Sequence, residues 1–185
     1  MAKRLCFIAT PKEKNLYKEI EIDFKYFSGF AVSQKQKSIK ALHESIAMLN
    51  PELRVLEVST KSTNPIGVKL SAFNLKFYNE RLKKEFPLEN IFQSSKVFQK
   101  GGPYLDLLDV KPKDAKKDKR LQTSGELKYF QHNNEIWELE PKTMFYDWIY
   151  INALIRDQEL VNEVIKYDCF TDIEFKGMRV CFYSQ

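Results

Sequence analysis

The sequence predicts an α+β fold, a single compact and mainly helical domain with a small antiparallel β portion, spanning residues 1–185. Residues 18–27 alternate between apolar and charged side chains, which is typical of a half-buried strand. Residues 33–49 and 140–155 repeat apolar side chains at spacings of three and four, which is typical of helices packed on a core. The length fits one domain, and 43% hydrophobic residues are enough to form its interior.

A strand followed by a helix is expected first. The strand places one apolar row on its buried face: Ile20, Ile22, Phe24 and Tyr26. Ser33 can cap the helix, and Asn50 with Pro51 ends it. The helix should bury Ile39, Leu42, Ile46 and Leu49.

The middle of the chain predicts a hairpin and a short helix. Residues 53–59 and 68–78 are β-branched and aromatic, and residues 62–67 between them resemble a turn, so these segments should pair. A short helix is expected at 88–98. Residues 111–120 should form a loop or a short solvated helix.

Two helices are expected near the end. The longest begins at Glu140-Pro141, because proline is tolerated in a first turn. Asp157 caps a second helix. In the longest helix one apolar stripe should face the core, formed by Met144, Trp148, Ile151 and Ile155 and widened by Phe145, Ile149 and Ala153.

Composition excludes several classes of protein. No apolar run approaches the length of a membrane span, so a cytoplasmic protein without a membrane partner is expected. Cys6, Cys169 and Cys181 are odd in number and far apart, which predicts reduced thiols. His43, expected at a helix surface, and His132, expected in a turn, give no zinc spacing with them, so no metal is implied.

The net charge of +5 is compatible with a polyanionic substrate. Six of the ten residues at 111–120 are basic, and they could either neutralise phosphates or form solvated surface, because Asp114 and Asp118 dilute the charge. Five aromatic residues could stack on a base, although Trp148 fits a core stripe and Trp137 is the more open candidate: Phe27, Phe30, Trp137, Trp148 and Tyr150. Phosphate-binding glycine loops, serine elbows and kinase motifs are absent from the sequence.

Three polar residues share one face of the helix expected at 88–98. Glu89, Gln93 and Lys96 stand at i, i+4 and i+7. They could supply an acid/base pair at the anomeric carbon of a sugar, or form a solvated face with a weak ion pair.

This segment resembles the heart of the NADAR (YbiA-like) family, which has Glu, Gln, Lys and Phe at the positions of Glu89, Gln93, Lys96 and Phe98. Residues 27–30 are similar to the family's Phe-Ser-Asn-Phe element. Trp137, Lys142 and Met144 are similar to its Trp, Lys and Met run.

The resemblance is closer to the branch that serves as antitoxin to DarT-type DNA ADP-ribosyltransferases, and it extends over roughly residues 19–175. The chain departs from the wider family at Asn90, where His is usual, at residues 91–92, where two aromatics are usual, and in the tail at 178–185. The segments similar to the branch are residues 32–39, 68–74, 96–98, 101–104, 145–154 and 170–175.

The resemblance implies hydrolysis of the bond between ADP-ribose and the guanine amine in DNA, without cofactor or metal. The partners implied are ADP-ribosylated DNA and a cognate DarT-type toxin. A small ribosylamine such as a riboflavin-pathway intermediate is an alternative substrate. A non-enzymatic antitoxin that binds its toxin, or a plain DNA-binding module, is the alternative of a different class.

The resemblance also implies roles for individual residues. Glu89 is the expected catalytic carboxylate. A lysine could instead attack C1 of the opened ribose and form an imine, with Lys96, Lys35 and Lys37 as candidates in that order. Asp172 is a third catalytic candidate. The substrate-binding residues implied are Phe27, Ser28, Phe30, Lys37, Asn74, Gln93, Trp137, Lys142, Asp147 and Glu174.

Overall fold

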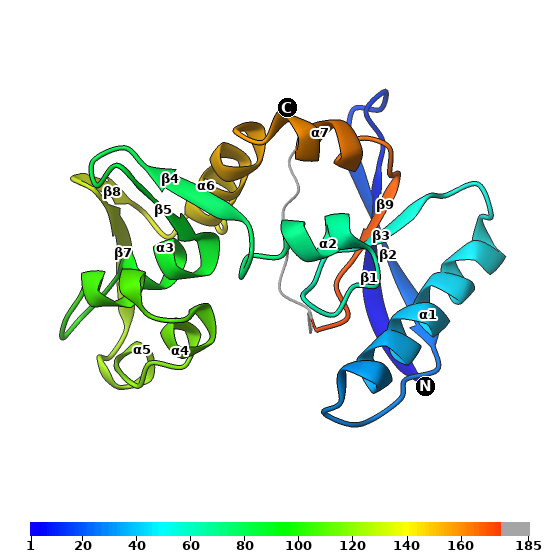
Figure 1. Cartoon of the computed structure of the whole chain (residues 1–185), viewed down its shortest axis with the longest axis horizontal. Helices are drawn as coiled ribbons and strands as arrows, with labels where there is room; N and C mark the ends of the chain where they lie inside the picture. The colour runs from blue at the N-terminus through cyan, green and yellow to red at the C-terminus, as the bar shows by residue number, and fades with distance from the viewer. Residues whose placement is uncertain (175–185) are drawn as a thin grey trace. The chain divides into compact units, whose positions relative to one another are not determined.

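The computed structural model describes residues 1–174, which fold into two compact units with both helices and strands (Figure 1). The described part of the first unit comprises residues 1–71 and 158–174, and the second comprises residues 72–157. The α+β prediction is confirmed, but a mainly helical fold is not supported, because strands make up a substantial part of both units. The unusual tail at 178–185 and Cys181 lie outside the described residues.

The first unit is built on a four-stranded sheet in the order β2-β1-β9-β3. β1 pairs antiparallel with β2 and with β9, whereas β3 pairs parallel with β9. The last described strand therefore lies between two strands from the beginning of the chain. The bounds are β1 Ala2–Ala9, β2 Tyr17–Phe24, β3 Val55–Glu57 and β9 Cys169–Thr171.

Helix α1, Val32–Leu49, packs against this sheet. Ile39, Leu42 and Ile46 are buried as predicted, and Leu49 is exposed because the helix ends there, where the Asn50 N–H donates to the Ile46 carbonyl. On the strand side Ile22 and Phe24 are buried, while Ile20 is 39% exposed. The core of the unit combines Cys6, Ile22, Phe24, Ile39, Leu42, Ile46, Cys169 and Ile173.

The predicted hairpin of residues 53–59 with 68–78 is wrong. Asn64 Oδ1 accepts a hydrogen bond from Ile66 N at 2.9 Å and Pro65 occupies the first turn, so the supposed turn starts helix α2, Pro65–Leu70. β3 pairs with β9 instead. The predicted helix after Asp157 is confirmed as α7, Gln158–Val164, which contacts α2.

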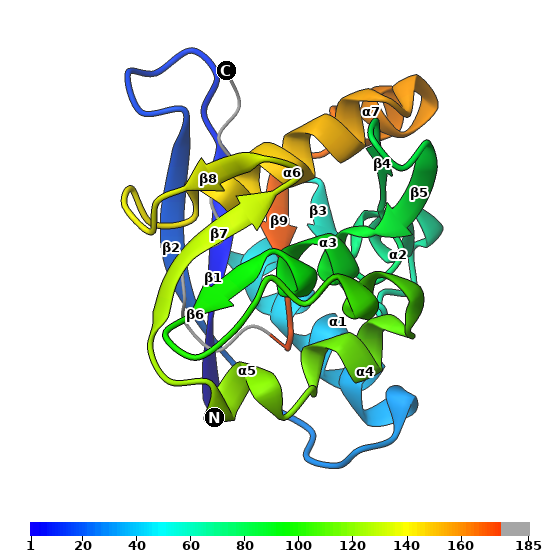
Figure 2. The same ribbon diagram turned by 90° about the vertical axis from the view of Figure 1, so that its left-hand side faces the viewer.

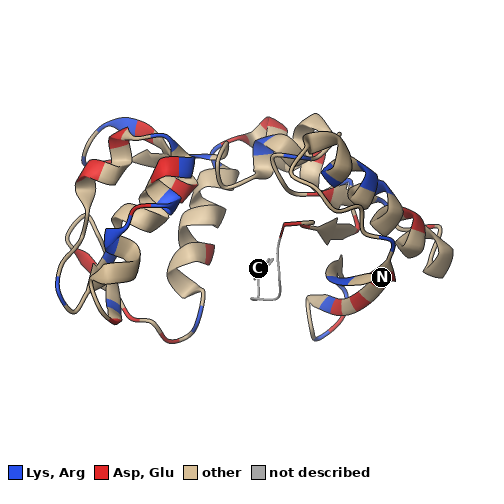
Figure 3. Cartoon of the chain, turned by 90° about the horizontal axis from the view of Figure 1, so that it is seen from below, with Lys and Arg blue, Asp and Glu red and all other residues tan. Residues whose placement is uncertain are grey.

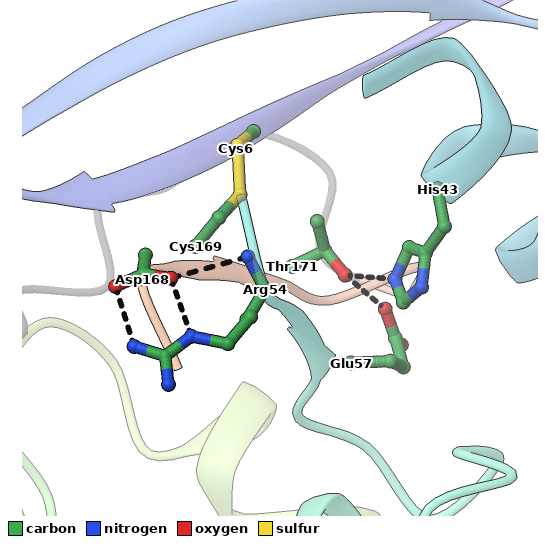
Figure 4. The surroundings of a disulfide bond; sticks show 7 residues. All are labelled: Cys6, His43, Arg54, Glu57, Asp168, Cys169 and Thr171. Carbon is green, nitrogen blue, oxygen red and sulfur yellow. Dashed lines mark hydrogen bonds and ion pairs between the residues drawn. A yellow bond between two sulfur atoms is a disulfide. The ribbon is translucent and has the colours of Figure 1, made fainter. Parts of the chain in front are cut away.

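The prediction of reduced thiols is wrong for two cysteines. Cys6 on β1 and Cys169 on β9 are joined in a disulfide, because these neighbouring strands bring together residues 163 positions apart (Figure 4). Beside this bond, the Arg54 guanidinium donates two hydrogen bonds to the Asp168 carboxylate, at 2.9 and 3.1 Å, and the Arg54 backbone N–H donates a third at 3.2 Å. Sheet pairing therefore created a contact that residue spacing does not reveal.

The second unit combines small sheets with short helices (Figure 2). β4 and β5 form one antiparallel pair, and β6, β7 and β8 form a three-stranded antiparallel sheet. The strands are β4 Lys76–Asn79, β5 Lys84–Pro87, β6 Lys96–Phe98, β7 Leu127–His132 and β8 Glu135–Trp137. The helices are α3 Leu88–Ser94, the 3-10 helix η1 Leu105–Asp109, α4 Pro112–Lys116, α5 Arg120–Thr123 and α6 Met144–Ile155.

The helix predicted at 88–98 is shorter than expected. It ends at Ser94, and Lys96 begins strand β6. His132 was expected in a turn, but it is the last residue of β7, is 6% exposed, and packs against Phe77 and Trp148.

The apolar stripe predicted for the longest helix is also wrong. Met144, Ile151 and Ile155 are exposed and Trp148 is half-buried, whereas α6 buries Phe145, Asp147, Ile149, Tyr150 and Ala153. The helix starts at Met144 rather than at Pro141, whose peptide bond with Glu140 is cis. The residues expected only to widen the stripe therefore form its buried face.

Candidate active site

A buried carboxylate and amide lie together on helix α3. Glu89 and Gln93 are each 5% exposed, and Gln93 Nε2 donates to Glu89 Oε1 at 2.8 Å. The flanking Leu88 and Ile91 are fully buried, and the Glu89 N–H donates to the Ala72 carbonyl, so the helix is fixed on both sides of the pair. Gln93 Oε1 is buried and has no hydrogen-bond partner within residues 1–174, which leaves one acceptor available.

Lys96 follows this pair on strand β6. Burial lowers the pKa of the Lys96 ammonium, the charge of Glu89 partly offsets this effect, and the charge of Lys116 adds to the lowering. Its Nζ lies 4.7 Å from the centroid of the Phe92 ring. A lysine in such surroundings loses its proton more readily than one in water, which makes it a better nucleophile. Glu89, Gln93 and Lys96 are therefore brought together by a helix followed by a strand, not by one helical face.

Aromatic side chains surround this region of the second unit. The ring centroids of Phe92 and Phe130 are 5.3 Å apart, and those of Phe130 and Phe145 are 4.9 Å apart. Trp137 and Trp148 belong to the same cluster, with their centroids 4.9 Å apart. The predicted difference between a core Trp148 and an open Trp137 is not seen, because both are half-buried and Trp137 Nε1 is buried without a partner in the described residues.

Asp147 is a second buried carboxylate of this unit, in the first turn of α6. It is 8% exposed, and burial raises its pKa to about 6 although Thr143 Oγ1 donates to its Oδ2 at 2.9 Å. Its Oδ1 has no hydrogen-bond partner among residues 1–174. Asn74 and Lys142, predicted to bind substrate, are exposed residues of the same unit.

The other predicted residues belong to the first unit. Lys35 Nζ donates to the Tyr26 hydroxyl at 2.8 Å, and the Phe27 N–H donates to Ser38 Oγ at 2.9 Å. Asp172 is half-buried and its Oδ1 accepts from the Glu174 N–H at 2.9 Å. The remaining four are exposed: Ser28, Phe30, Lys37 and Glu174.

The family to which the chain belongs follows from a match over almost its whole length. A family model described as DarT1-associated NADAR antitoxin matches residues 2–181. The chain belongs to this family. No curated protein matches the sequence. The predicted membership in the DarT-associated NADAR branch is therefore confirmed.

The departure at Asn90 has a structural explanation in this NADAR protein. Asn90 is fully buried, and its Nδ2 donates to the carbonyls of Leu107 and Val110 at 2.7 and 2.8 Å. The side chain thus connects α3 to the segment around η1. Its amide holds the helix that carries Glu89.

The basic segment at 111–120 is partly neutralised by neighbouring carboxylates. Arg120 forms ion pairs with Asp106 at 2.6 Å and with Asp118 at 2.9 Å. Figure 3 shows Lys and Arg interspersed with Asp and Glu in both units. The segment is therefore not a continuous basic surface.

Sequence reasoning missed a polar network in the first unit of this NADAR protein. Glu57 is 1% exposed, and burial raises its pKa to about 7. His43, predicted at the surface, is half-buried, and burial lowers its pKa to about 4. Thr171 contacts both side chains (Figure 4). Of the three, Thr171 alone falls in a segment that resembles the DarT branch, and no pattern in the sequence marks Glu57.

Residues 1–174 contain no group of three or more His, Cys, Asp or Glu side chains arranged to hold a metal ion. In the same part of the chain, no helix combines the length and the apolar character needed to cross a bilayer.

Proposed function

We propose that this NADAR protein is an N-glycosidase that removes ADP-ribose from guanine bases in DNA and so acts as the antitoxin of a DarT1-type toxin. The observation that carries the proposal is the buried Glu89 carboxylate, hydrogen-bonded to Gln93 and close enough to Lys96 to influence its pKa. Family membership supports the antitoxin role.

Glu89 would stabilise the reacting sugar. Cleavage of the bond between C1 of ribose and the guanine amine leaves positive charge at C1, which a nearby carboxylate stabilises. Water adds to C1, the electron pair of the broken bond stays on the guanine nitrogen, and a proton reaches that nitrogen. The Gln93 N–H fixes the orientation of Glu89 for this step, and Gln93 Oε1 accepts a hydrogen bond from substrate.

Lys96 offers a covalent route to the same products. Its neutral amine attacks C1 of a ring-opened ribose, the guanine amine leaves with a proton, and the resulting imine is hydrolysed by water to ADP-ribose and free lysine. Burial favours this route because it lowers the pKa of Lys96. Lys35 is the second candidate, since its amine is hydrogen-bonded to the Tyr26 hydroxyl.

The guanine base requires hydrogen-bond acceptors and a surface on which to stack. Asp147 Oδ1, which has no hydrogen-bond partner in residues 1–174, is an acceptor suited to a guanine N–H, and the aromatic cluster containing Trp137 supplies π faces. In the first unit, Asp172 is proposed as a further catalytic residue, and Phe27, Phe30 and Lys37 are proposed to contact the substrate DNA. Substrate contacts are also proposed for Ser28 and Glu174 of the first unit and for Asn74 and Lys142 of the second.

The test is multiple turnover on a DNA oligonucleotide that carries ADP-ribosylated guanine. The protein, present at far lower concentration than the DNA, should release free ADP-ribose and restore unmodified guanine. A small ribosylamine, assayed in parallel, should be a much poorer substrate. Unchanged DNA combined with tight binding of the toxin would instead identify a non-enzymatic antitoxin, and preferential cleavage of the ribosylamine would identify a metabolite-directed glycosidase.

A further inference from the structure

Three side chains form a hydrogen-bonded chain through the interior of the first unit. His43 Nε2 on α1 lies 3.0 Å from Thr171 Oγ1 on β9, and Thr171 Oγ1 lies 2.7 Å from Glu57 Oε2 on β3. Glu57 Oε1 accepts from the Ile173 N–H at 2.8 Å. Figure 4 shows the Thr171 hydroxyl between the imidazole and the carboxylate.

The hydrogen bonds of this network can all point in one of two directions, because the Thr171 hydroxyl has a single hydrogen to donate. When Glu57 is ionised it only accepts, so Thr171 donates to Glu57 and accepts from His43 Nε2–H. The neutral ring then has a bare Nδ1, a hydrogen-bond acceptor. When Glu57 carries a proton on Oε2 it donates to Thr171, Thr171 donates to Nε2, and the ring proton moves to Nδ1. Nδ1–H is then a donor.

His43 also lines a groove beside α1. The groove has a volume of about 630 Å³, and since Nε2 is directed at Thr171, the Nδ1 edge is the polar edge of the ring that remains for the groove. Its other lining residues are Ser33, Gln36, Lys37, Ile39, Lys40, Glu44, Ala47 and Thr63. A groove of this volume can hold a nucleotide unit.

The charged residues of the groove favour an anion. Glu44 lies 3.8 Å from Lys40 and offsets its charge. Lys37 is exposed and forms no ion pair with any carboxylate in residues 1–174. Within the described part of the chain, Lys37 therefore carries a positive charge that no ion pair offsets, and Ser33 and Gln36 supply further hydrogen-bond donors.

We propose that this groove is a DNA-backbone site, in which Lys37 pairs with a phosphodiester and His43 Nδ1–H donates to the same strand when Glu57 is protonated. The inference rests on the proposed function, because it takes DNA as the substrate. It adds a contact to the strand outside the Glu89 site, and it makes that contact depend on one buried proton.

The change of His43 Nδ1 from acceptor to donor, called here the switch, should occur near neutral pH. Burial raises the pKa of Glu57 to about 7, opposed by hydrogen bonds from Ile173, Thr171 and Ser59 and assisted by the charge of Asp172. On the groove side, the charged neighbours of His43 are Lys37, Lys40 and Glu44. Phosphodiester oxygens only accept hydrogen bonds, so they prefer the donor state. Affinity should therefore fall as the pH rises through about 7, by about tenfold for one hydrogen bond to a charged group.

The binding test uses a short unmodified thymidine oligonucleotide, whose phosphodiesters do not titrate near neutral pH. Glu57→Gln should remove the pH dependence and keep high affinity throughout, because the glutamine amide donates permanently to Thr171 while its oxygen still accepts from Ile173. Thr171→Val should remove the pH dependence, because valine cannot connect His43 to Glu57 through hydrogen bonds. Lys37→Ala should weaken binding about tenfold, and Lys12→Ala, at an exposed lysine in the β1–β2 loop, is the matched control for lost charge.

Nitrogen-15 NMR of the imidazole rings tests the switch independently of DNA. The chain has two histidines, so a His132 variant assigns the signals of His43. The proton should be on Nδ1 below the Glu57 pKa, on Nε2 above it, and on Nδ1 at every pH in Glu57→Gln. A wild-type ring that keeps one tautomer throughout, or oligonucleotide binding that ignores both pH and Lys37, overturns the inference. Neither measurement requires turnover, so this failure is distinguishable from a failure of the glycosidase assay.

Discussion

The buried pair of Glu57 and His43 should give the protein a stability maximum in mildly acidic solution. The pKa of Glu57 is raised from 4.5 to about 7, and that of His43 is lowered from 6.5 to about 4. The contribution of Glu57 to the free energy of unfolding is therefore fully present below its unfolded pKa, and it is lost as pH rises through about 7. The contribution of His43 to the free energy of unfolding is fully present above its unfolded pKa, and it is lost as pH falls through about 4.

Each shift is about 2.5 pKa units, which corresponds to about 3 kcal/mol at about 1.4 kcal/mol per unit. Between the two unfolded values, 4.5 and 6.5, the two contributions change in opposite directions and cancel, so the free energy of unfolding of the wild type should be nearly constant there. It should fall by only about 0.7 kcal/mol on either side, over the half unit that separates each unfolded value from the folded pKa of the other group. Urea unfolding measured across this pH range gives the profile. In Glu57→Gln the free energy of unfolding should rise by about 3 kcal/mol from pH 4 to 6.5, and in His43→Gln it should fall by about 3 kcal/mol from pH 4.5 to 7, because each variant leaves one contribution unopposed.

Differences between variant and wild type isolate these contributions from those of other groups, such as Asp147, whose pKa is also raised by burial. A free energy of unfolding that stays constant from pH 4.5 to 7 in His43→Gln would refute the assignment of Glu57 as a buried group that is hard to ionise. The same conclusion follows if Glu57→Gln loses stability at alkaline pH as steeply as the wild type.

Three further predictions concern the second unit and the packing of the first. Borohydride during turnover should trap a sugar adduct on the wild type and none on Lys96→Met, as shown by mass spectrometry; trapping on both variants would move the nucleophile elsewhere. The glycosidase rate should fall as pH drops through about 6, because Asp147 then loses its charge. Asp147→Asn should be slower, and its rate should no longer fall over this pH range. A fall that persists in the variant excludes Asp147 as its source. Gly67→Ala should lower the free energy of unfolding by about 3 kcal/mol, because the added Cβ would lie 1.9 Å from the Glu57 carbonyl oxygen. In Gly29→Ala the nearest atom to the added Cβ is Gln34 Cγ at 3.2 Å, so the free energy of unfolding should fall by only about 1 kcal/mol. Equal losses in the two variants would contradict the packing argument.

Local patterns were sufficient where one element determines its own structure. The alternation at 18–27 gave strand β2, and the apolar spacing after Ser33 gave α1 with Ile39, Leu42 and Ile46 inside. The spacing of Glu89 and Gln93 correctly placed their side chains together on α3. Lys96 reached the same neighbourhood by a strand, so its proximity was predicted for the wrong reason.

Contacts between distant segments could not be predicted from the sequence. The parallel pairing of β3 with β9 buries Glu57 and places it beside Thr171, 114 positions away. The antiparallel pairing of β1 with β9 joins Cys6 to Cys169. On α6, the predicted stripe of Met144, Trp148, Ile151 and Ile155 is not the buried face. The side of the helix that carries Phe145 is buried instead, and Phe145 packs there against Phe130.

The most direct measurement is the rate at which Glu89→Gln releases ADP-ribose from guanine in a modified oligonucleotide, with Glu85→Gln as the control at an exposed position of β5. Glutamine preserves the size of the buried side chain but removes the charge. The rate should fall by about two orders of magnitude or more while the unfolding free energy changes little and the control stays active. Turnover by Glu89→Gln close to that of the wild type would remove this carboxylate from the reaction and contradict the proposed chemistry.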